Sequence, residues 1–437
     1  MDPVFIGLLG IVVLIALVVL GMKVWLALTI VSLVGIIIIR DLELALVSIR
    51  NLPYNDLARY GLAVIPLFIL MGELFHQFGF SRELFNAAQR YLSSLKGGML
   101  MTVITVSAIF AAISGSGMAS SAVIGKMALP AMVKAGYDKS VSAGTIAASS
   151  TFASLIPPSA HLVIYGFLTF QSIGELFIAA IIPGIISAAI YFGYMYVWAL
   201  KNPDKVPPTR PVVRENFWGE LKITSRAWPT GLVIVLIIGG IYLGIFTPNE
   251  AGAAGVFAVI LLGLLNRSVT ASKLRDSVLD TVKTTASIFI IYLGSMFFVR
   301  FLAHSRLPYV FTEWMLALPL PETGILLCIL LIFMVLGCFI PPLALLMIAV
   351  PIVYPTIEML GIHPIWFGIL VIKTIEMGMI TPPVGINCFI IGGIMPKEVP
   401  LDTVFRGSAR FLVLDFITLF ILIAFPILSL YLPAKMM

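Results

Sequence analysis

The stretch ASLIPPSAHLVIYG at residues 153–166 breaks an apolar helix with a Pro-Pro pair, and MGMITPPVGINCFIIGG at residues 377–393 does the same about 225 residues later. A proline pair removes two backbone N–H donors and clashes with the preceding turn, so neither helix can run straight through. Within a bilayer, a broken helix is stable only where its freed polar groups line a cavity or meet a ligand. Two such breaks at corresponding places are typical of binding sites in transporters built from two related halves.

The composition is that of a protein with many membrane spans. Hydrophobic residues make up 60% of the 437 residues and charged residues only 11%, whereas a soluble domain carries roughly a quarter charged residues. The apolar residues run along the whole length, which excludes a soluble protein with a single anchor. The first apolar stretch has no basic segment before it, so we interpret it as a transmembrane helix and not as a cleaved signal peptide. The three cysteines have no regular spacing and predict neither a disulfide framework nor a metal motif.

Ten stretches are long and apolar enough to cross a bilayer, since a span needs about 20 residues. Two further stretches, 99–133 and 323–354, are interrupted by GSG at 115–117 and by GCFIPP at 337–342. Their pieces are shorter than a span and predict re-entrant hairpins, which enter and leave on one side. Segments 41–57 and 268–282 mix polar and apolar residues and predict arm helices at the interface. The ten predicted spans are residues 3–21, 24–40, 60–80, 141–168, 175–200, 228–246, 250–266, 284–303, 365–395 and 408–432.

The two halves of the chain align at a nearly constant offset. Each half holds five spans and one hairpin, and an odd number of spans turns the second half upside down. The sequence therefore predicts an all-α polytopic membrane protein of two inverted repeats, with about ten transmembrane helices and two re-entrant hairpins. The aligned anchors are Gly72 with Gly294, Ser81-Arg82 with Ser305-Arg306, Gly115 with Gly337, Pro130 with Pro351, and Pro157-Pro158 with Pro382-Pro383.

The distribution of basic residues sets the orientation. With both termini outside, the predicted cytoplasmic segments hold 19 of the 27 Lys and Arg residues, as the positive-inside rule requires. The net charge of +6 is thereby explained by topology, and no nucleic-acid partner is expected. The 19 residues are Lys23, Arg82, Arg90, Lys96, Lys134, Lys139, Lys201, Lys205, Arg210, Arg214, Lys222, Arg226, Arg267, Lys273, Arg275, Lys283, Lys397, Arg406 and Arg410.

The hairpins and broken helices are expected to form one moving body and the remaining spans a fixed one. Matched inverted halves allow inward and outward states of similar energy, which favours an elevator-type transporter. The predicted parts are the scaffold helices of the first repeat (1–96), the first half of the transport domain (97–200), a cytoplasmic linker (201–226), the scaffold helices of the second repeat (227–320) and the second half of the transport domain (321–437).

The chemistry at the breaks suits a cation beside an anion. Glycines at the first hairpin tip, residues 114–121, allow close backbone approach, and serines supply hydroxyls and caps. Amides that open a helix carry partial positive charge and suit a carboxylate, whereas carbonyls that end one suit a hard cation such as sodium. The alternative is that the glycines and prolines only aid helix packing. Four interruptions in matched pairs favour the binding site.

The motifs GSGMASSA (115–122), IPPSAHLVIYG (156–166) and TPPVGINCFIIGG (381–393) resemble the large membrane (M) subunit of tripartite ATP-independent periplasmic transporters, the TRAP family. The resemblance covers essentially the whole chain. It implies a sodium-coupled elevator importer of an organic acid, of the sialic acid or C4-dicarboxylate type, in the bacterial inner membrane. It also implies two sodium sites, a small four-helix membrane subunit (Q type) as a separate chain, and a periplasmic binding protein that delivers the solute.

Carried over to this sequence, the resemblance implies three groups of site residues. His161 is not expected in every member, so we interpret it as a residue that tunes specificity. The first sodium site would use Ser114, Gly115, Ser116, Pro157 and Ser159; the second would use Gly337, Pro341, Thr381, Pro382 and Gly385; the carboxylate substrate would meet Ser120, Ser121, Ser159, His161, Val384 and Asn387.

Charged residues inside apolar stretches each need a reason, because a charge at the bilayer centre costs about 2.5–3.5 kcal/mol on insertion scales. Lys373 and Glu376 lie three apart and are predicted to pair with each other. Lys126 is predicted to snorkel toward the cytoplasm, and attraction of an anion is the alternative. Glu73 and Asp415 could carry protons or bond to neighbouring helices, and the sequence leaves both open.

Other classes of function fit less well. A stand-alone sodium/anion symporter or a sodium/proton antiporter of similar architecture is the alternative within the same structural class. A channel would keep polar rings along a continuous pore, whereas the polar residues here cluster at the breaks. The chain shows no nucleophile–base pair, metal-ligand cluster or Walker sequence, so we do not expect an enzyme.

Overall fold

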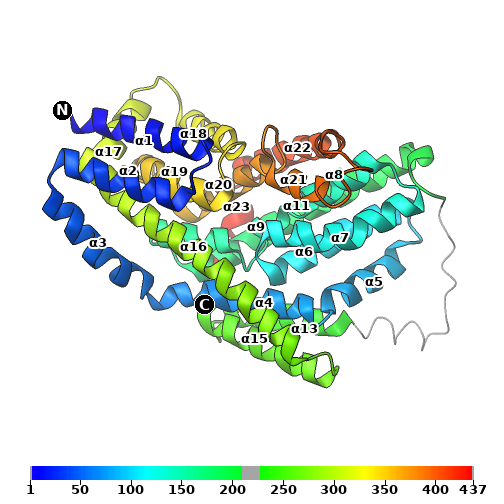
Figure 1. Cartoon of the computed structure of the whole chain (residues 1–437). Coiled ribbons are helices and arrows are strands. Elements are labelled where there is room, and N and C mark those ends of the chain that lie inside the picture. The colour runs from blue at the N-terminus through cyan, green and yellow to red at the C-terminus, as the bar shows by residue number, and fades with distance from the viewer. Residues whose placement is uncertain (1, 209–226, 436–437) are drawn as a thin grey trace.

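The chain folds into helices, as the sequence predicts. The computed structural model describes residues 2–208 and 227–435, and in these two ranges it contains no strand. Seven helices there are long and apolar enough to cross a membrane, and five shorter apolar helices accompany them. Most of the predicted linker at 201–226 lies outside the described residues. Figure 1 shows the long helix α16 (Ala271–Ser305) running diagonally across the molecule.

The first half contains the predicted spans, the first hairpin and the first broken helix. A short 3-10 turn at Tyr60–Ala63 leads into the third span. The helices are α1 (Pro3–Val19), α2 (Val24–Ile39), α3 (Leu42–Leu57), α4 (Val64–Gln77), α5 (Phe80–Leu92), the hairpin α6 (Gly98–Ser114) and α7 (Gly117–Ala135), the broken helix α8 (Lys139–Ser149), α9 (Phe152–Leu155) and α10 (Ala160–Thr169), and α11 (Ile173–Lys201).

The second half repeats this order. Its first span bends through a π-helical turn at Val235–Gly239, between α13 and α14. The helices are α13 (Trp228–Ile234), α14 (Gly240–Tyr242), α15 (Pro248–Leu265), α16, α17 (Leu307–Leu316), the hairpin α18 (Glu322–Gly337) and α19 (Pro342–Met359), the broken helix α20 (Pro364–Gly378) and α21 (Ile386–Gly392), α22 (Leu401–Ala424) and α23 (Ile427–Leu430).

The helix ends follow ordinary capping chemistry. The Ser116 hydroxyl accepts a hydrogen bond from the Ala119 amide where α7 begins, and Asp138 accepts one from the Val141 amide where α8 begins. Gly136, in the left-handed region at φ +89°, ends α7. These caps fix where the second arm of the first hairpin begins and where the broken helix begins, so the local sequence sets both positions.

The packing confirms the inverted repeat, because the main contacts between the halves come in pairs related by exchange of the halves. Helix α8 packs on α22, and its equivalent α20 packs on α11. Helix α10 packs on α19 of the second hairpin, and α21 packs on α7 of the first. The outer spans follow the same exchanged pattern, since α2 packs on α16 and its equivalent α15 packs on α4. A two-fold relation between the halves produces this crosswise pattern.

The hairpins, the broken helices, α11 and α22 share one core, where Tyr165, Tyr191 and Phe367 are buried completely. The α8–α22 contact is especially close, because a Cβ on Gly144 would lie 2.2 Å from the carbonyl carbon of Gly407. Only glycine allows backbones to approach this far. The first and second halves therefore pack directly against each other within this group of helices.

Two features differ from the expectations. The arm expected at 268–282 is not a separate helix, because α16 continues through it for 35 residues. In the first half, α3 and α4 remain separate helices, divided at Ala58–Ala63. The short helices α5 and α17, which follow equivalent spans in the two halves, were not predicted.

Candidate functional site

The first break is closed by a serine side chain. In a continuous helix the Ser154 carbonyl would accept from the amide of residue 158, but Pro158 has none. The Ser159 hydroxyl donates to the Ser154 carbonyl instead. The same hydroxyl oxygen accepts the His161 amide at 3.2 Å and so caps α10. Ser159 therefore holds both ends of the break, and its oxygen sits at the start of a helix.

The second break is closed by the backbone. Met379 lies four residues before Pro383, as Ser154 lies four residues before Pro158. Its carbonyl therefore has no helical partner, because Pro383 has no amide hydrogen. The Asn387 amide donates to the Met379 carbonyl at 3.1 Å across the break. Just before the prolines, the Thr381 hydroxyl donates to the Met377 carbonyl at 2.6 Å. Both proline pairs contain a cis peptide bond.

Each hairpin tip touches the break of its own half. A Cβ on Gly115, which has φ +61°, would lie 2.7 Å from the Pro158 carbonyl oxygen. In the second half, a Cβ on Gly378 would lie 2.6 Å from the Gly337 carbonyl oxygen. Only glycine leaves room for these backbone contacts. Both hairpins therefore carry their tips to the points where the broken helices expose polar backbone.

The two breaks also touch each other. The Ser154 hydroxyl lies 3.8 Å from the Met379 sulfur, and the Asn387 side-chain amide donates to the Ala147 carbonyl at 3.3 Å. A Cβ on Gly117, at the first hairpin tip, would lie 3.1 Å from the terminal methyl of Met379. All four interruptions therefore meet in one region of the molecule, as the repeat predicts.

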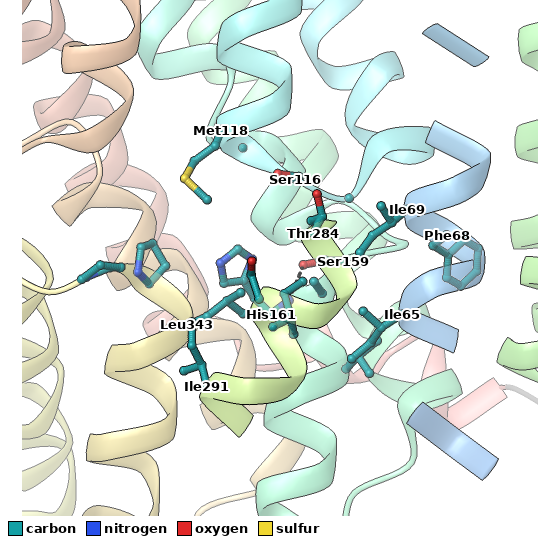
Figure 2. A pocket seen from close by; sticks show the side chains of 18 of the residues that line it. Ile65, Phe68, Ile69, Ser116, Met118, Ser159, His161, Thr284, Ile291 and Leu343 are labelled. Atoms are coloured by element: carbon teal, nitrogen blue, oxygen red, sulfur yellow. Dashed lines mark hydrogen bonds between the residues drawn. The ribbon is translucent and has the colours of Figure 1, made fainter. Parts of the chain in front are cut away.

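A cavity of about 210 Å³ opens where these elements meet. Its walls come from the first hairpin tip, the first break, residues 341–344 at the start of α19, and the outer helices α4 and α16. Figure 2 shows Ser159 and His161 opposite Thr284 of α16, with Ser116 and Met118 above them and Ile65 and Ile69 of α4 alongside. The cavity thus lies between the two groups of helices.

Within the described ranges, no Asp, Glu, Lys or Arg lines this cavity; its polar groups are backbone, hydroxyls and one imidazole. His161 is buried, and its Nδ1 has no hydrogen-bond partner among the described residues. The Ser114 hydroxyl is buried and equally unpartnered in that part of the chain. Buried polar atoms without partners are uncommon, so these two are available to a ligand. The site can bind ions through helix ends and neutral donors, without fixed charges.

The structure brings some of the expected site residues to the cavity and places others elsewhere. Met379, Thr284 and Ser287 line it although no pattern in the sequence marks them. Lining it are Ser114, Gly115, Ser116, Ser159, His161 and Pro341; away from it are Pro157, Ser120, Ser121, Gly337, Thr381, Pro382, Val384, Gly385 and Asn387.

The residues away from the cavity have different environments. Ser120 and Ser121 are buried in α7, and their hydroxyls have no partner among the described residues. Asn387 is buried between the breaks, and its Oδ1 is also unpartnered there. By contrast, Pro382 and Val384 at the second break are exposed, although the first proline pair is buried. In this conformation the two breaks therefore differ in their access to solvent.

A buried charged cluster lies on helices α11, α20 and α22. Lys373 is completely buried, and its ammonium donates to Asp415 at 2.7 Å and to Glu376 at 3.2 Å. The Tyr191 hydroxyl also donates to Asp415, at 2.8 Å. The predicted Lys373–Glu376 pair is confirmed, and Asp415 bonds to neighbouring helices. The cluster joins α11, α20 and α22 through its hydrogen bonds.

Comparison with known proteins identifies relatives along nearly the whole chain. Residues 11–428 match the family described as "Tripartite ATP-independent periplasmic transporter, DctM component". The C4-dicarboxylate TRAP transporter large permease protein DctM of Pseudomonas aeruginosa is 32% identical over 390 residues, covering 88% of this chain and 90% of that protein. The sialic acid TRAP transporter large permease protein SiaM of Vibrio cholerae is 32% identical, covering 86% of each chain.

Two further likenesses bear on substrate and fold. The ectoine TRAP transporter large permease protein TeaC of Halomonas elongata is 33% identical, covering 85% of this chain and 86% of that protein. Among solved structures, the YdaH transporter of Alcanivorax borkumensis aligns with a TM-score of 0.63 and 14% identity, covering 86% of this chain and 88% of that chain. This second likeness concerns the fold alone.

Proposed function

Because the chain belongs to the DctM component family of tripartite ATP-independent periplasmic transporters, we propose that it is a sodium-coupled importer of an organic acid that receives its solute from a periplasmic binding protein. The chain is a transporter permease and not an enzyme. The observation that carries the proposal is the cavity at Gly115, Ser159 and His161, where helix ends converge and no described residue supplies a fixed charge.

Helix ends supply both kinds of binding group. The amides that open α7 and α10 carry partial positive charge and suit a carboxylate. Carbonyls at the first hairpin tip and before Ser159 suit sodium, which we place at Ser114, Gly115, Ser116, Pro157 and Ser159. Binding one cation beside one carboxylate keeps an uncharged cavity neutral, so each ion lowers the cost of binding the other.

We place a second sodium ion at the other hairpin and break. Its support is that this hairpin tip also meets the broken helix of its own half, since a Cβ on Gly378 would lie 2.6 Å from the Gly337 carbonyl oxygen. The Val384 amide donates to the Cys338 carbonyl at 3.3 Å and joins this hairpin tip to its break. The proposed site uses carbonyls and hydroxyls of Gly337, Pro341, Thr381, Pro382 and Gly385.

The moving body in this proposal consists of residues 97–200 and 321–437, and the outer helices form the fixed body. The crosswise packing of the hairpins and broken helices supports a single rigid unit. The cavity at the boundary with α4 and α16 supports transfer of the bound solute past a fixed wall. Matched inverted halves favour two states of similar energy, as an elevator mechanism needs.

The partners follow from the family. We propose a small membrane subunit of about four helices that braces the fixed body, as the M-subunit resemblance implies. The distribution of basic residues supports an orientation with both termini in the periplasm, and the family supports a location in the bacterial inner membrane. Relatives are named for C4-dicarboxylates, sialic acid and ectoine, which carry a carboxylate group, and one is named for isethionate, which carries a sulfonate instead. We propose that the substrate is a small organic acid, with a carboxylate as the group that most of these solutes share.

Reconstitution tests this function. The chain, its small subunit and its binding protein are placed in liposomes, and uptake of labelled C4-dicarboxylate, sialic acid and ectoine is measured with an inward sodium gradient. We expect uptake of one carboxylate that stops without the gradient or without the binding protein. Uptake without the binding protein would indicate a stand-alone symporter, and flux that persists after the sodium gradient collapses would indicate a channel.

A further inference from the structure

The central cavity continues toward one side of the molecule. A second cavity of about 210 Å³ shares Ile69, Ser114, Ser116, Met118 and Thr284 with the first. Shared walls show that the two cavities adjoin. The second cavity runs between α4 and the first hairpin, where it meets Glu73, His76 and Val123.

A third cavity, of about 560 Å³, shares His76 and Val123 with the second. Arg82 of α5 and Lys126 of α7 line this cavity from opposite walls, and both side chains are exposed. The three cavities therefore form one route from Ser159 to a mouth between α5 and α7.

The mouth is positively charged. No carboxylate among the described residues pairs with Arg82 or Lys126. Asn86 and Gln89 of α5 line the same cavity and add side-chain amides that can donate to an oxyanion. Of the described residues along the whole route, Glu73 is the one acidic wall residue, and it lies between the central cavity and the mouth. Its charge disfavours an anion at that intermediate point, so an anion is held at either end.

The equivalent region of the second half is closed off from the site. A cavity of about 500 Å³ there is lined by Arg306, the repeat counterpart of Arg82, and by Pro351, the counterpart of Pro130. None of its described lining residues lines the central cavity. The molecule is therefore open toward the Arg82 side and closed toward the Arg306 side, and the positive-inside distribution identifies the open side as cytoplasmic.

We propose that Arg82 and Lys126 form a second anion-binding site, which receives a small carboxylate from the central cavity and releases it into the cytoplasm. The carboxylate as ligand rests on the proposed function. Two cations that no described carboxylate pairs with face one passage and raise the local concentration of anions there. In the proposed mechanism the first hairpin moves past α4, so this route would close in the other state and the site would serve the release step.

A single cysteine tests the charge and the side of the route. Val123→Cys places a thiol where the second and third cavities meet, in a background where Cys328, Cys338 and Cys388 are replaced by serine. Inside-out and right-side-out membrane vesicles are treated with an anionic sulfonatoethyl or a cationic trimethylammonioethyl methanethiosulfonate. Rates are normalised to those for a small free thiol, and the background chain without Val123→Cys is the blank.

We expect labelling from the cytoplasmic side, with the anionic reagent favoured. Adding Arg82→Gln and Lys126→Gln should lower the ratio of anionic to cationic rates about tenfold, and high salt should lower it in the parent. Glu73→Gln should raise the ratio. Lys134→Gln is the matched control, because Lys134 is an exposed cation on the same helix that lines none of these cavities, and it should leave the ratio unchanged.

Labelling only from the periplasmic side, or a ratio that is unchanged in the Arg82→Gln, Lys126→Gln variant, overturns the proposal. Gel filtration of each variant shows whether it folds. If the double variant does not fold, the ratio is measured in the single variant Arg82→Gln. The labelling needs no sodium gradient and no binding protein. A failure of receptor-dependent uptake therefore remains distinguishable from a failure of this site.

Discussion

The side chains of Ser154 and Met379, which occupy equivalent places before the two proline pairs, touch at 3.8 Å between hydroxyl and sulfur. A residue that contacts its own repeat counterpart lies near the two-fold axis that relates the halves. The broken helices therefore share one centre. Because each break gives up a helical hydrogen bond at this centre and recovers it through Ser159 or Asn387, the bends are built into the fold and need no ligand to hold them.

The backbone contact between Gly115 and Pro158 should be needed for transport. In Gly115→Ala, a Cβ would sit 2.7 Å from the Pro158 carbonyl oxygen in a left-handed conformation, so the hairpin tip must shift. We expect sodium-driven uptake to fall at least about tenfold, since an ångström-scale misplacement near a site can cost about 100-fold. Uptake is measured in liposomes and divided by the amount of folded protein.

Gly136→Ala is the matched control for this substitution. Gly136 has the same left-handed backbone, at φ +89°, but a Cβ there would meet nothing within 4 Å. We expect a loss of stability of about 1 kcal/mol from the backbone alone and near-normal uptake. Equal losses of uptake in the two variants would mean that the hairpin tip does not depend on the Gly115–Pro158 contact.

His161 should contribute to substrate affinity. Among the described residues it is the one titratable side chain that lines the central cavity, and its Nδ1 has no partner there. A hydrogen bond to a charged carboxylate contributes about 1.5–3 kcal/mol. We therefore expect His161→Leu to raise the solute concentration for half-maximal uptake about tenfold or more, while the sodium dependence changes little.

Met118→Leu, on the opposite wall of the same cavity, is the control for altered shape. It exchanges side chains of similar volume and should change the half-maximal concentration little. Comparable effects of the Met118 and His161 variants would show that the imidazole acts through packing alone.

Removing one partner of the buried Lys373–Asp415 pair should strongly destabilise the fold. Lys373→Met leaves two carboxylates buried without their cation, and breaking a buried pair typically costs about 3–5 kcal/mol. We expect a lower thermal unfolding temperature in detergent. Adding Asp415→Leu removes one of the two stranded carboxylates and should recover part of the loss. Independent, additive losses in the double variant would contradict a coupled cluster.

The sequence predicts the fold well where proline and glycine interrupt apolar runs. The two Pro-Pro pairs and the tips at Gly115 and Gly337 mark the breaks, and the constant offset predicts the inverted repeat that the packing confirms. The first break also marks Ser159 and His161 as binding-site candidates, and both line the central cavity. Whether they bind sodium and solute stays a prediction.

Other features depend on tertiary contacts that local sequence does not encode. Asp415 and Lys373 lie 42 residues apart on different helices, so no local sequence pattern predicts that they pair. Thr284 reaches the cavity from α16, and nothing in its neighbours marks it as a wall residue. The prediction of a separate arm helix at 268–282 was wrong. Residues 271–293 contain no glycine or proline to end a helix, so α16 continues through this segment.

The most direct test of the central claim is a sodium titration of thermal unfolding for the purified chain, at constant ionic strength with choline. A ligand that binds the folded state raises stability in proportion to the logarithm of its concentration above the dissociation constant. Sodium should raise the unfolding temperature and potassium should not. Ser159→Ala and Thr381→Ala should each require about tenfold more sodium, equivalent to about 1.4 kcal/mol.

Two controls separate ion binding from folding. Ser172→Ala removes the cap of α11, and Thr374→Ala removes a buried hydroxyl on α20, so both should lower the unfolding temperature and leave the sodium midpoint in place. If sodium does not stabilise the chain, or if the midpoint stays the same in both Ser159→Ala and Thr381→Ala, the interrupted helices do not hold the coupling ion.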